Sequence, residues 1–219
     1  MTLDLHVHTR PGSRDSTIEY EDLAVCAQRA GLDGICITEH GNRKSGVAES
    51  LSQKHGFLFL EGVELLTEHG DVLIYGVEEV PLSLFTFEAV RSFVLGVGGL
   101  MFAAHPFRAE ITRPIMRYTQ PALTLEQALD RKVFAMIDGI EVANGWSCQE
   151  DVDFSREVAE RLGLFGIGGS DAHKPEQIGS CVTVFDDPIA CEAELVERLR
   201  TGRFRPEDRR PPDRRGLYA

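Results

Sequence analysis

The chain has 219 residues, a length that suits about one domain with one sizeable core. Hydrophobic residues make up 42% and charged residues 26% of the chain, which excludes disordered, collagen-like and fibrous proteins. The 35 acidic residues outnumber the 23 basic ones, and this balance argues against nonspecific binding to nucleic acid or to an anionic membrane. Carboxylates can also gather around bound cations, so the charge leaves a phosphorylated substrate open.

Cysteine content and hydropathy bear on the compartment. The longest apolar stretch, residues 93–104, is too short to cross a bilayer, which takes about 20 residues, and no basic and apolar leader opens the chain. The 5 cysteines are an odd number without CxxC spacing, so we expect neither a disulfide framework nor a cysteine zinc site. These features predict a cytoplasmic protein without a membrane partner.

Short apolar runs alternate with helical patterns along the chain. Strands are predicted over residues 3–9, 34–38, 57–64, 72–77, 100–105, 139–143, 164–169 and 181–185. Helices are predicted over residues 21–30, 47–55, 87–95, 125–131, 153–162 and 190–200. Such alternation indicates βαβ units, a mostly parallel sheet and a closed or nearly closed β/α barrel. We expect one domain over residues 1–205 and a loose, arginine- and proline-rich tail over residues 206–219.

The first predicted strand carries two histidines on one face. Asp4, His6 and His8 alternate with apolar residues, so their side chains point to the same side. A lone buried histidine is most often a satisfied core residue, but two at i and i+2 near a strand's end are common as metal ligands. Asp4 is placed to orient a histidine rather than to bind metal.

More polar residues stand at the carboxyl ends of later strands, the edge at which β/α folds build their functional sites. Five of the seven histidines fall at such ends: His6, His8, His40, His105 and His173. Unrelated core histidines would be scattered instead. The pattern therefore favours one shared site.

Together these motifs resemble the PHP family, the polymerase and histidinol phosphatase metal-dependent hydrolases, in its stand-alone form. The resemblance covers nearly the whole chain and implies a distorted (β/α)7 barrel. It rests on Asp4-Leu5-His6-Val7-His8-Thr9, on the run from Ala30 to His40, and on Gly62-Val63-Glu64, Ala104-His105-Pro106 and Gly169-Ser170-Asp171-Ala172-His173.

The resemblance implies two or three divalent metal ions per chain. The residues that it assigns as ligands are His6, His8, Asp15, His40, Glu64, His105, Asp171 and His173. Glu64 would bridge the first ion to a second at His105, and Asp15 would belong to the third, although Asp15 could simply cap a helix. Imidazole and carboxylate ligands suit Zn, Mn or Fe without selecting among them.

One position departs from the family pattern. Many members carry a further histidine on the strand after the bridging glutamate, where this chain has Leu73. His69 or Asp71 would replace it if the register of the strand shifts. His69 is therefore a tentative ligand, and it could equally be an exposed turn residue.

Two arginines are candidates to bind a substrate phosphate. Arg108 follows His105 on a loop at the same edge, and Arg10 follows the first motif. A loop arginine is usually solvated, so both assignments are tentative. Asn144 ends another strand there and suits a hydrogen bond to a ligand rather than metal binding.

The expected activity is metal-dependent hydrolysis of a small phosphorylated metabolite or nucleotide by a metal-bound hydroxide, with no protein nucleophile. A nuclease acting on nucleic-acid ends is one alternative, which the acidic charge disfavours. A metal-binding scaffold without turnover is the other. No phosphate-binding P-loop, dinucleotide fingerprint or serine-hydrolase elbow occurs in the sequence.

Overall fold

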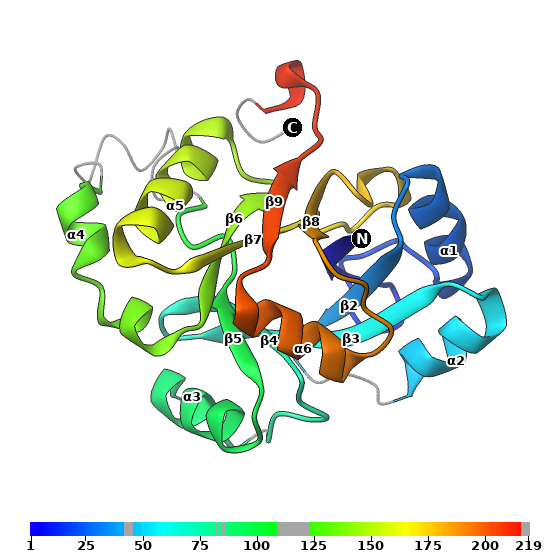
Figure 1. Ribbon diagram of the computed structural model, residues 1–219, viewed down its shortest axis with the longest axis horizontal. Helices are drawn as coiled ribbons and strands as arrows, with labels where there is room; N and C mark the ends of the chain where they lie inside the picture. Colours follow the sequence, from blue (N-terminus) through cyan, green and yellow to red (C-terminus); the bar gives the residue numbers. More distant parts are fainter. Residues whose placement is uncertain (42–45, 82, 85, 109–122, 216–219) are drawn as a thin grey trace.

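The computed structural model describes residues 1–41, 46–81, 83–84, 86–108 and 123–215. They form a strongly curved sheet with helices around its outside (Figure 1). The strands are β1 (Thr2–Val7), β2 (Gly34–His40), β3 (Leu58–Thr67), β4 (Gly70–Tyr75), β5 (Leu100–Ala103), β6 (Gly139–Asn144), β7 (Phe165–Gly169), β8 (Cys181–Phe185) and β9 (Phe204–Asp208). The α-helices are α1 (Tyr20–Arg29), α2 (Val47–His55), α3 (Phe87–Gly96), α4 (Leu125–Leu129), α5 (Gln149–Leu162) and α6 (Glu192–Thr201), and three short 3-10 helices are η1 (Lys132–Met136), η2 (Pro175–Gln177) and η3 (Pro212–Arg214).

The strands lie in the order β7-β6-β5-β4-β3-β2-β1-β8-β9. A bridge between Val7 of β1 and Ala172, which follows β7, joins the β7 end of the sheet back to β1, so the sheet is a nearly closed barrel. This confirms the predicted α/β barrel class. The expectation of a mostly parallel sheet is wrong, because among the described strands four pairs are parallel and four are antiparallel. The connection between β3 and β4 is far shorter than the dozen or so residues that a parallel crossover needs, so these strands form a hairpin.

Capping residues mark the ends of several helices. The Thr86 side chain accepts a hydrogen bond from the amide of Ala89 and starts α3. Gly163 ends α5 in the left-handed conformation, at φ 66°. None of the described helices has the length and apolar character needed to cross a membrane.

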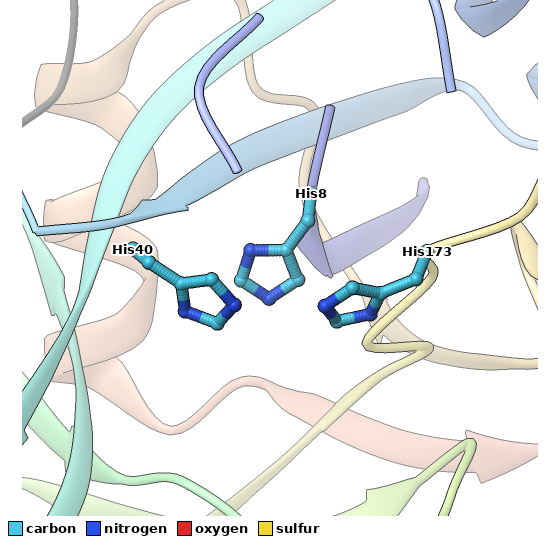
Figure 2. A group of neighbouring side chains, drawn as sticks. All are labelled: His8, His40 and His173. Atoms are coloured by element: carbon cyan, nitrogen blue, oxygen red, sulfur yellow. The ribbon is translucent and has the colours of Figure 1, made fainter. Parts of the chain in front are cut away.

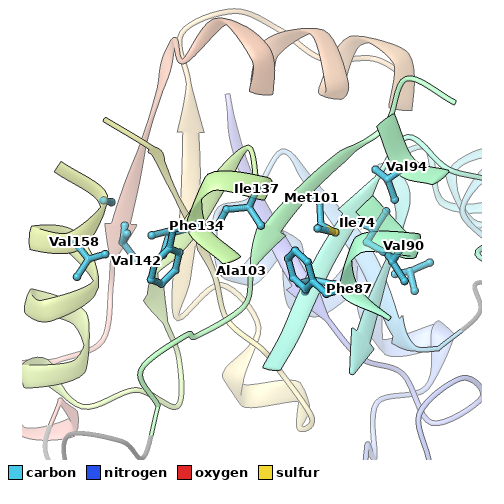
Figure 3. Close-up of a cluster of buried hydrophobic side chains, with 14 of the residues drawn as sticks. Ile74, Phe87, Val90, Val94, Met101, Ala103, Phe134, Ile137, Val142 and Val158 are labelled. Atoms are coloured by element: carbon cyan, nitrogen blue, oxygen red, sulfur yellow. The ribbon is translucent and has the colours of Figure 1, made fainter. Parts of the chain in front are cut away.

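Three apolar clusters hold the barrel together. One lies between β4–β6 and the helices α3 and α5, with Met101 and Phe87 at its centre (Figure 3). A second packs α1 and α2 against the outside of β1–β3. The third draws on strands from around the whole sheet and includes Leu195 and Leu199 of α6, so α6 covers one end of the barrel. The predicted metal ligands lie at the opposite end of the barrel, where the parallel strands have their carboxyl ends.

The C-terminal segment differs from the loose tail predicted over residues 206–219. Strand β9 includes residues 206–208 and pairs with β8, and Arg210 is buried and bound to Asp208. Arginine and proline content suggested a solvated chain, but a buried carboxylate partner lets this arginine pack inside. The last four residues of the predicted tail, 216–219, lie outside the described part.

Candidate metal centre

The predicted ligands meet at the carboxyl ends of the parallel strands. His6 lies in β1, His40 ends β2, and Glu64 stands beside His40 in the register of β3. His105 follows β5, and Asp171 follows β7. The β1–β2 register shifts between Asp4 and Val7, next to His6, and such irregularities often re-aim side chains at functional sites.

Four side chains form the innermost group. The Nε2 atoms of His6 and His8 are 2.9 Å apart. Glu64 oxygens lie 3.3 Å from the first and 3.2 Å from the second, and Asp171 Oδ1 lies 3.5 and 3.2 Å from them. Two ligands on one ion at about 2.0–2.1 Å in tetrahedral geometry are roughly 3.3 Å apart. The observed spacing therefore fits a shared divalent cation.

Glu64 also faces the other histidines. His105 Nε2 lies 3.0 Å from Glu64 Oε1, and His40 Nδ1 lies 2.9 Å from Glu64 Oε2. The two oxygens of one carboxylate therefore face different imidazoles. This is the arrangement that a bridging carboxylate requires.

A more open group surrounds Asp15. Its Oδ2 lies 3.3 Å from His40 Nε2 and 3.5 Å from His173 Nε2, and its side chain is 61% exposed. His8, between them, faces both rings, with ring centroids 4.2 Å from His40 and 4.5 Å from His173 (Figure 2). Asp15 thus lies beside two histidines, and the N-cap position of the following helix, α1, is Glu19 and not Asp15.

The side chains at this centre fit the divalent metal ions that the sequence implies. Within the described residues, three sets of three have ligand atoms that all lie within 4.8 Å of one another. The sets are His8, His40 and His173; His6, His8 and Asp171; and His6, Glu64 and His105. The middle set overlaps the first through His8 and the last through His6, so the three sets form one continuous cluster. Imidazole and carboxylate donors without thiolate suit Zn, Mn or Fe.

Charge is concentrated in this buried space. Burial alone would raise the pKa of Glu64, but the positive charge of His6 and hydrogen bonds from His105 and His40 hold that pKa far below its ordinary value. Burial would likewise lower the pKa of His6, but Asp171, Glu141 and Glu64 raise it well above its ordinary value. A divalent cation would take the place of the His6 proton among these carboxylates.

Metal affinity is therefore expected to rise with pH. At pH values below the raised pKa of His6, the imidazole is protonated, and this proton must dissociate before a cation can bind to the ring nitrogen. We expect a change of up to about tenfold per pH unit for each proton released, levelling off above that pKa. Calorimetric titration with Zn²⁺ or Mn²⁺ at several pH values around neutrality, in buffers of different ionisation enthalpy, measures both affinity and proton release. Affinity that is independent of pH, without proton release, would contradict this linkage.

Glu141 on β6 is a functional residue that the sequence reasoning missed. Its Oε1 lies 2.9 Å from His6 Nδ1, and its Oε2 accepts hydrogen bonds from the backbone amide of His105 and from Asn144 Nδ2. It is almost completely buried. A carboxylate behind a metal-ligating histidine fixes the ring and raises its basicity. The sequence feature that could have indicated this role is a single glutamate within an otherwise apolar predicted strand, residues 139–143.

Replacing Glu141 with glutamine is expected to weaken metal binding about 10- to 100-fold, because His6 loses its anionic partner while the volume is kept. Metal affinity by competition with a chelating dye measures this. Glu61→Gln is a matched control, because Glu61 is buried on β3 and its Oε1 accepts a hydrogen bond from the amide of Ala48, outside the ligand groups. Equal affinity of the Glu141→Gln and Glu61→Gln proteins would refute this role.

Two predicted ligands have a strained backbone. His105 and Asp171 have positive φ values of 30° and 54°. Such conformations cost of order 1–3 kcal/mol each and persist where the surroundings enforce them. The Trp146 indole donates to the backbone carbonyl of Asp171 at 2.8 Å, and Glu141 accepts from the amide of His105 at 2.9 Å.

The two candidate arginines have different surroundings. Arg108 Nη2 pairs with Asp171 and also donates to Asn144 Oδ1 at 3.2 Å, so it lies at the ligand groups. Arg10 is exposed and is paired with Glu19. Asn144 makes the second-layer hydrogen bonds that the sequence predicted, to Glu141 and Asp171.

Leu73 occupies the position of the family histidine. It pairs directly with Glu64 and is fully buried in the cluster inside the barrel. Asp71 lies two residues earlier on the same side of β4. Burial, and to a smaller extent the negative charge of Glu64, raise the pKa of Asp71. His69 is exposed in the turn before β4 and its ring packs against Phe87. Asp71 is therefore better placed than His69 to add a ligand beside His105.

Asp4 acts on the backbone instead of on a histidine ring. Its oxygens accept hydrogen bonds from the amides of Ser170, Gly179 and His6, at 2.9, 2.8 and 3.3 Å. Burial raises its pKa to about 6 in spite of these bonds. It joins the start of β1 to the segment that carries Asp171.

Sequence comparison agrees with this centre. Residues 4–91 match the PHP domain, and residues 150–204 match the PHP-associated C-terminal segment. The chain belongs to the PHP family. An uncharacterized protein of Methanocaldococcus jannaschii is 27% identical over 158 residues, which cover 67% of this chain and 83% of that protein.

Two other proteins that this chain resembles have descriptions that bear on function. A 3',5'-nucleoside bisphosphate phosphatase of Chromobacterium violaceum is 29% identical over 124 residues, covering 56% of this chain and 40% of that enzyme. A crystal structure from Bacteroides vulgatus, described as a two-domain protein containing a predicted PHP-like metal-dependent phosphoesterase, superposes with a TM-score of 0.71 and 21% identity. That match covers 95% of this chain and 65% of the other, so this chain spans less than two thirds of either protein. The structural match shows that the two chains share the barrel fold.

Proposed function

We propose that this protein is a metal-dependent phosphoesterase that hydrolyses a small phosphorylated metabolite or nucleotide. The observation that carries the proposal is the Glu64 carboxylate, whose oxygens lie 2.9–3.3 Å from ring nitrogens of four histidines. Such a buried carboxylate fits a bridge between divalent ions. The phosphatase from Chromobacterium violaceum supports a nucleotide-type substrate.

His6, His8, Glu64 and Asp171 would hold the first ion. His105, with Asp71 nearby, would hold a second beyond Glu64, and a third would lie among the remaining predicted ligands, Asp15, His40 and His173. Divalent ions in such a site supply an activated water and positive charge toward the phosphoryl oxygens.

The chain's own side chains then have separate tasks. Arg108 binds a phosphoryl oxygen from the side of Asp171, with a guanidinium that Asn144 orients. Glu141 holds the His6 ring so that Nε2 faces the ions. The strained backbone at His105 and Asp171 fixes both ligands before substrate arrives.

The space beside the centre suits a small molecule. A cavity of about 620 Å³ opens next to His105 and Arg108. Pockets for small ligands are about 300–1,000 Å³. The acidic chain disfavours a long polyanion, so a nuclease is the less favoured activity.

The first experiment measures metal content and turnover together. Protein purified without added metal is analysed for metal, stripped with a chelator, and assayed with p-nitrophenyl phosphate, bis(p-nitrophenyl) phosphate and a single-stranded oligonucleotide, with Mn²⁺, Zn²⁺ or Fe²⁺ restored. We expect two or three ions per chain and hydrolysis of the small esters that chelation abolishes and metal restores. Metal binding without turnover on any substrate would instead indicate the scaffold alternative, and turnover confined to the oligonucleotide would indicate a nuclease.

A further inference from the structure

The cavity beside the metal centre has a second wall that the proposed ligands do not use. At one end it is lined by Asp71, His105 and Arg108. Another part of the lining comes from the start of η1 and includes Arg131, Lys132, Val133 and Phe134. A substrate whose phosphate reaches the metal ligands would extend along this space.

Positively charged side chains are grouped at one part of the cavity lining. Acidic residues outnumber basic ones 35 to 23 in the sequence, yet the cavity lining includes Arg108, Arg131 and Lys132 against Glu68 and Asp71. The Glu68 carboxylate is engaged by the backbone amide of Phe87, at 2.9 and 3.0 Å. Because Arg108 is paired with Asp171, the cationic part of the lining is the adjacent pair Arg131 and Lys132, and two neighbouring positive side chains favour an anion there.

Arg131 is tied to the loop that carries the phosphate candidate. Its guanidinium carbon lies 5.6 Å from the ring centroid of Phe107. Phe107 is fully buried and comes directly before Arg108 in the sequence. A cation over an aromatic face is held in place and keeps donors directed to other partners. Arg108, in contrast, is bound to Asp171 and Asn144 at the centre itself. The two arginines therefore serve different parts of one cavity.

Apolar side chains complete the walls. Phe87, Val133 and Phe134 belong to the lining, with Phe87 and Phe134 buried in the apolar cluster beneath it. Such walls contact a small carbon body and leave charge recognition to the few polar groups.

We infer that the cavity binds the part of the substrate beyond the scissile phosphate, and that Arg131 and Lys132 recognise a second anionic group on it, a carboxylate or a phosphate. This inference rests on the proposed function and names the substrate class of the same site. Arg131 and Lys132 are specificity-determining residues, because they line the same cavity as His105 and Arg108 without belonging to the proposed metal ligands.

The test compares matched substrates on matched variants. The substrates are phenyl phosphate and its 4-carboxymethyl and 4-phosphonomethyl derivatives, each with one scissile ester. The variants are the wild type, Arg131→Gln/Lys132→Gln, and a control, Lys54→Gln/Arg156→Gln, which removes two exposed positive charges outside the cavity lining.

We expect the wild type and the control to favour a doubly anionic substrate by about tenfold or more in kcat/KM, mainly through KM. The Arg131→Gln/Lys132→Gln protein is expected to lose this preference while hydrolysing phenyl phosphate within about twofold of the wild type. The derivative that is preferred tells whether the second group is a carboxylate or a phosphate. An unchanged preference in this variant, or no preference in the wild type, overturns the inference.

A binding measurement separates this inference from the proposed activity. Calorimetry with metal-loaded protein compares phenylphosphonate with 4-(carboxymethyl)phenylphosphonate, neither of which is hydrolysed. Tighter binding of the second compound that disappears in Arg131→Gln/Lys132→Gln supports the anion site even if no ester is turned over. Equal binding of both compounds to the wild type overturns it, whatever the activity.

Discussion

The Glu64→Gln protein is expected to hydrolyse phosphoesters at least about 10³-fold more slowly than the wild type. The change keeps the shape of the side chain but removes the charge that faces four histidines. Loss of metal charge at the reacting phosphate is worth several kcal/mol, and each 1.4 kcal/mol is about tenfold in rate. Metal content should also fall, because an amide offers one neutral oxygen in place of a bridging carboxylate.

The measurement is kcat/KM for p-nitrophenyl phosphate together with metal content by elemental analysis. Glu61→Gln is again the control, because it changes a second buried glutamate of β3 outside the ligand groups. We expect that protein to retain its metal and most of its activity. Full activity and full metal content in Glu64→Gln would refute the bridging role of Glu64.

Strand-end motifs made much of the site predictable. The i, i+2 spacing of His6 and His8 requires a shared face on a strand, and their Nε2 atoms do lie together. His105 and Asp171 came from different strands, but parallel strands bring their carboxyl ends to one edge of a sheet. The barrel class followed from the same alternation, without knowledge of the strand directions.

Other features depend on contacts that no local pattern reveals. Glu141 is 135 positions from His6, and nothing in its own strand says which histidine it faces. The antiparallel direction of β4 follows from its very short connection to β3, which periodicity alone does not weigh. Composition suggested a solvated C-terminus, because the pairing of Arg210 with a buried Asp208 depends on how β9 packs against β8.

Arg210 connects this C-terminal segment to the metal centre. Its guanidinium binds Asp208, with Nε–Oδ1 at 3.0 Å and Nη2–Oδ2 at 2.8 Å, and donates to the carbonyls of Gly145 and Ser147. Trp146, between those two residues, donates to the backbone of Asp171. Adding a Cβ at Gly145 would bring it 2.2 Å from the carbonyl oxygen of Ser170, so this loop has little room to shift.

Replacing Arg210 with methionine is therefore expected to lower the free energy of unfolding by about 3 kcal/mol, the low end for breaking a buried pair, because the Asp208 side chain keeps only the longer ion pair with Arg215, at 3.6 Å. Burial by itself raises the pKa of Asp208, but Arg210 lowers it below its ordinary value. A lowered pKa contributes stability at neutral pH that disappears as pH falls through the acidic range, so the difference between the variant and the wild type should shrink there. Urea unfolding at neutral and acidic pH measures both effects.

The neighbouring Arg209 offers a matched control, because the residue is exposed and its side chain pairs with Glu207 and the carbonyl of Ala30 at the surface rather than with a buried carboxylate. Arg209→Met is expected to change the free energy of unfolding by no more than about 0.5 kcal/mol. An Arg210→Met/Asp208→Leu protein should recover part of the loss, since an apolar pair leaves no isolated charge inside. A cost below about 1 kcal/mol for Arg210→Met alone would show that the pair is not what holds the C-terminal segment against the Trp146 loop.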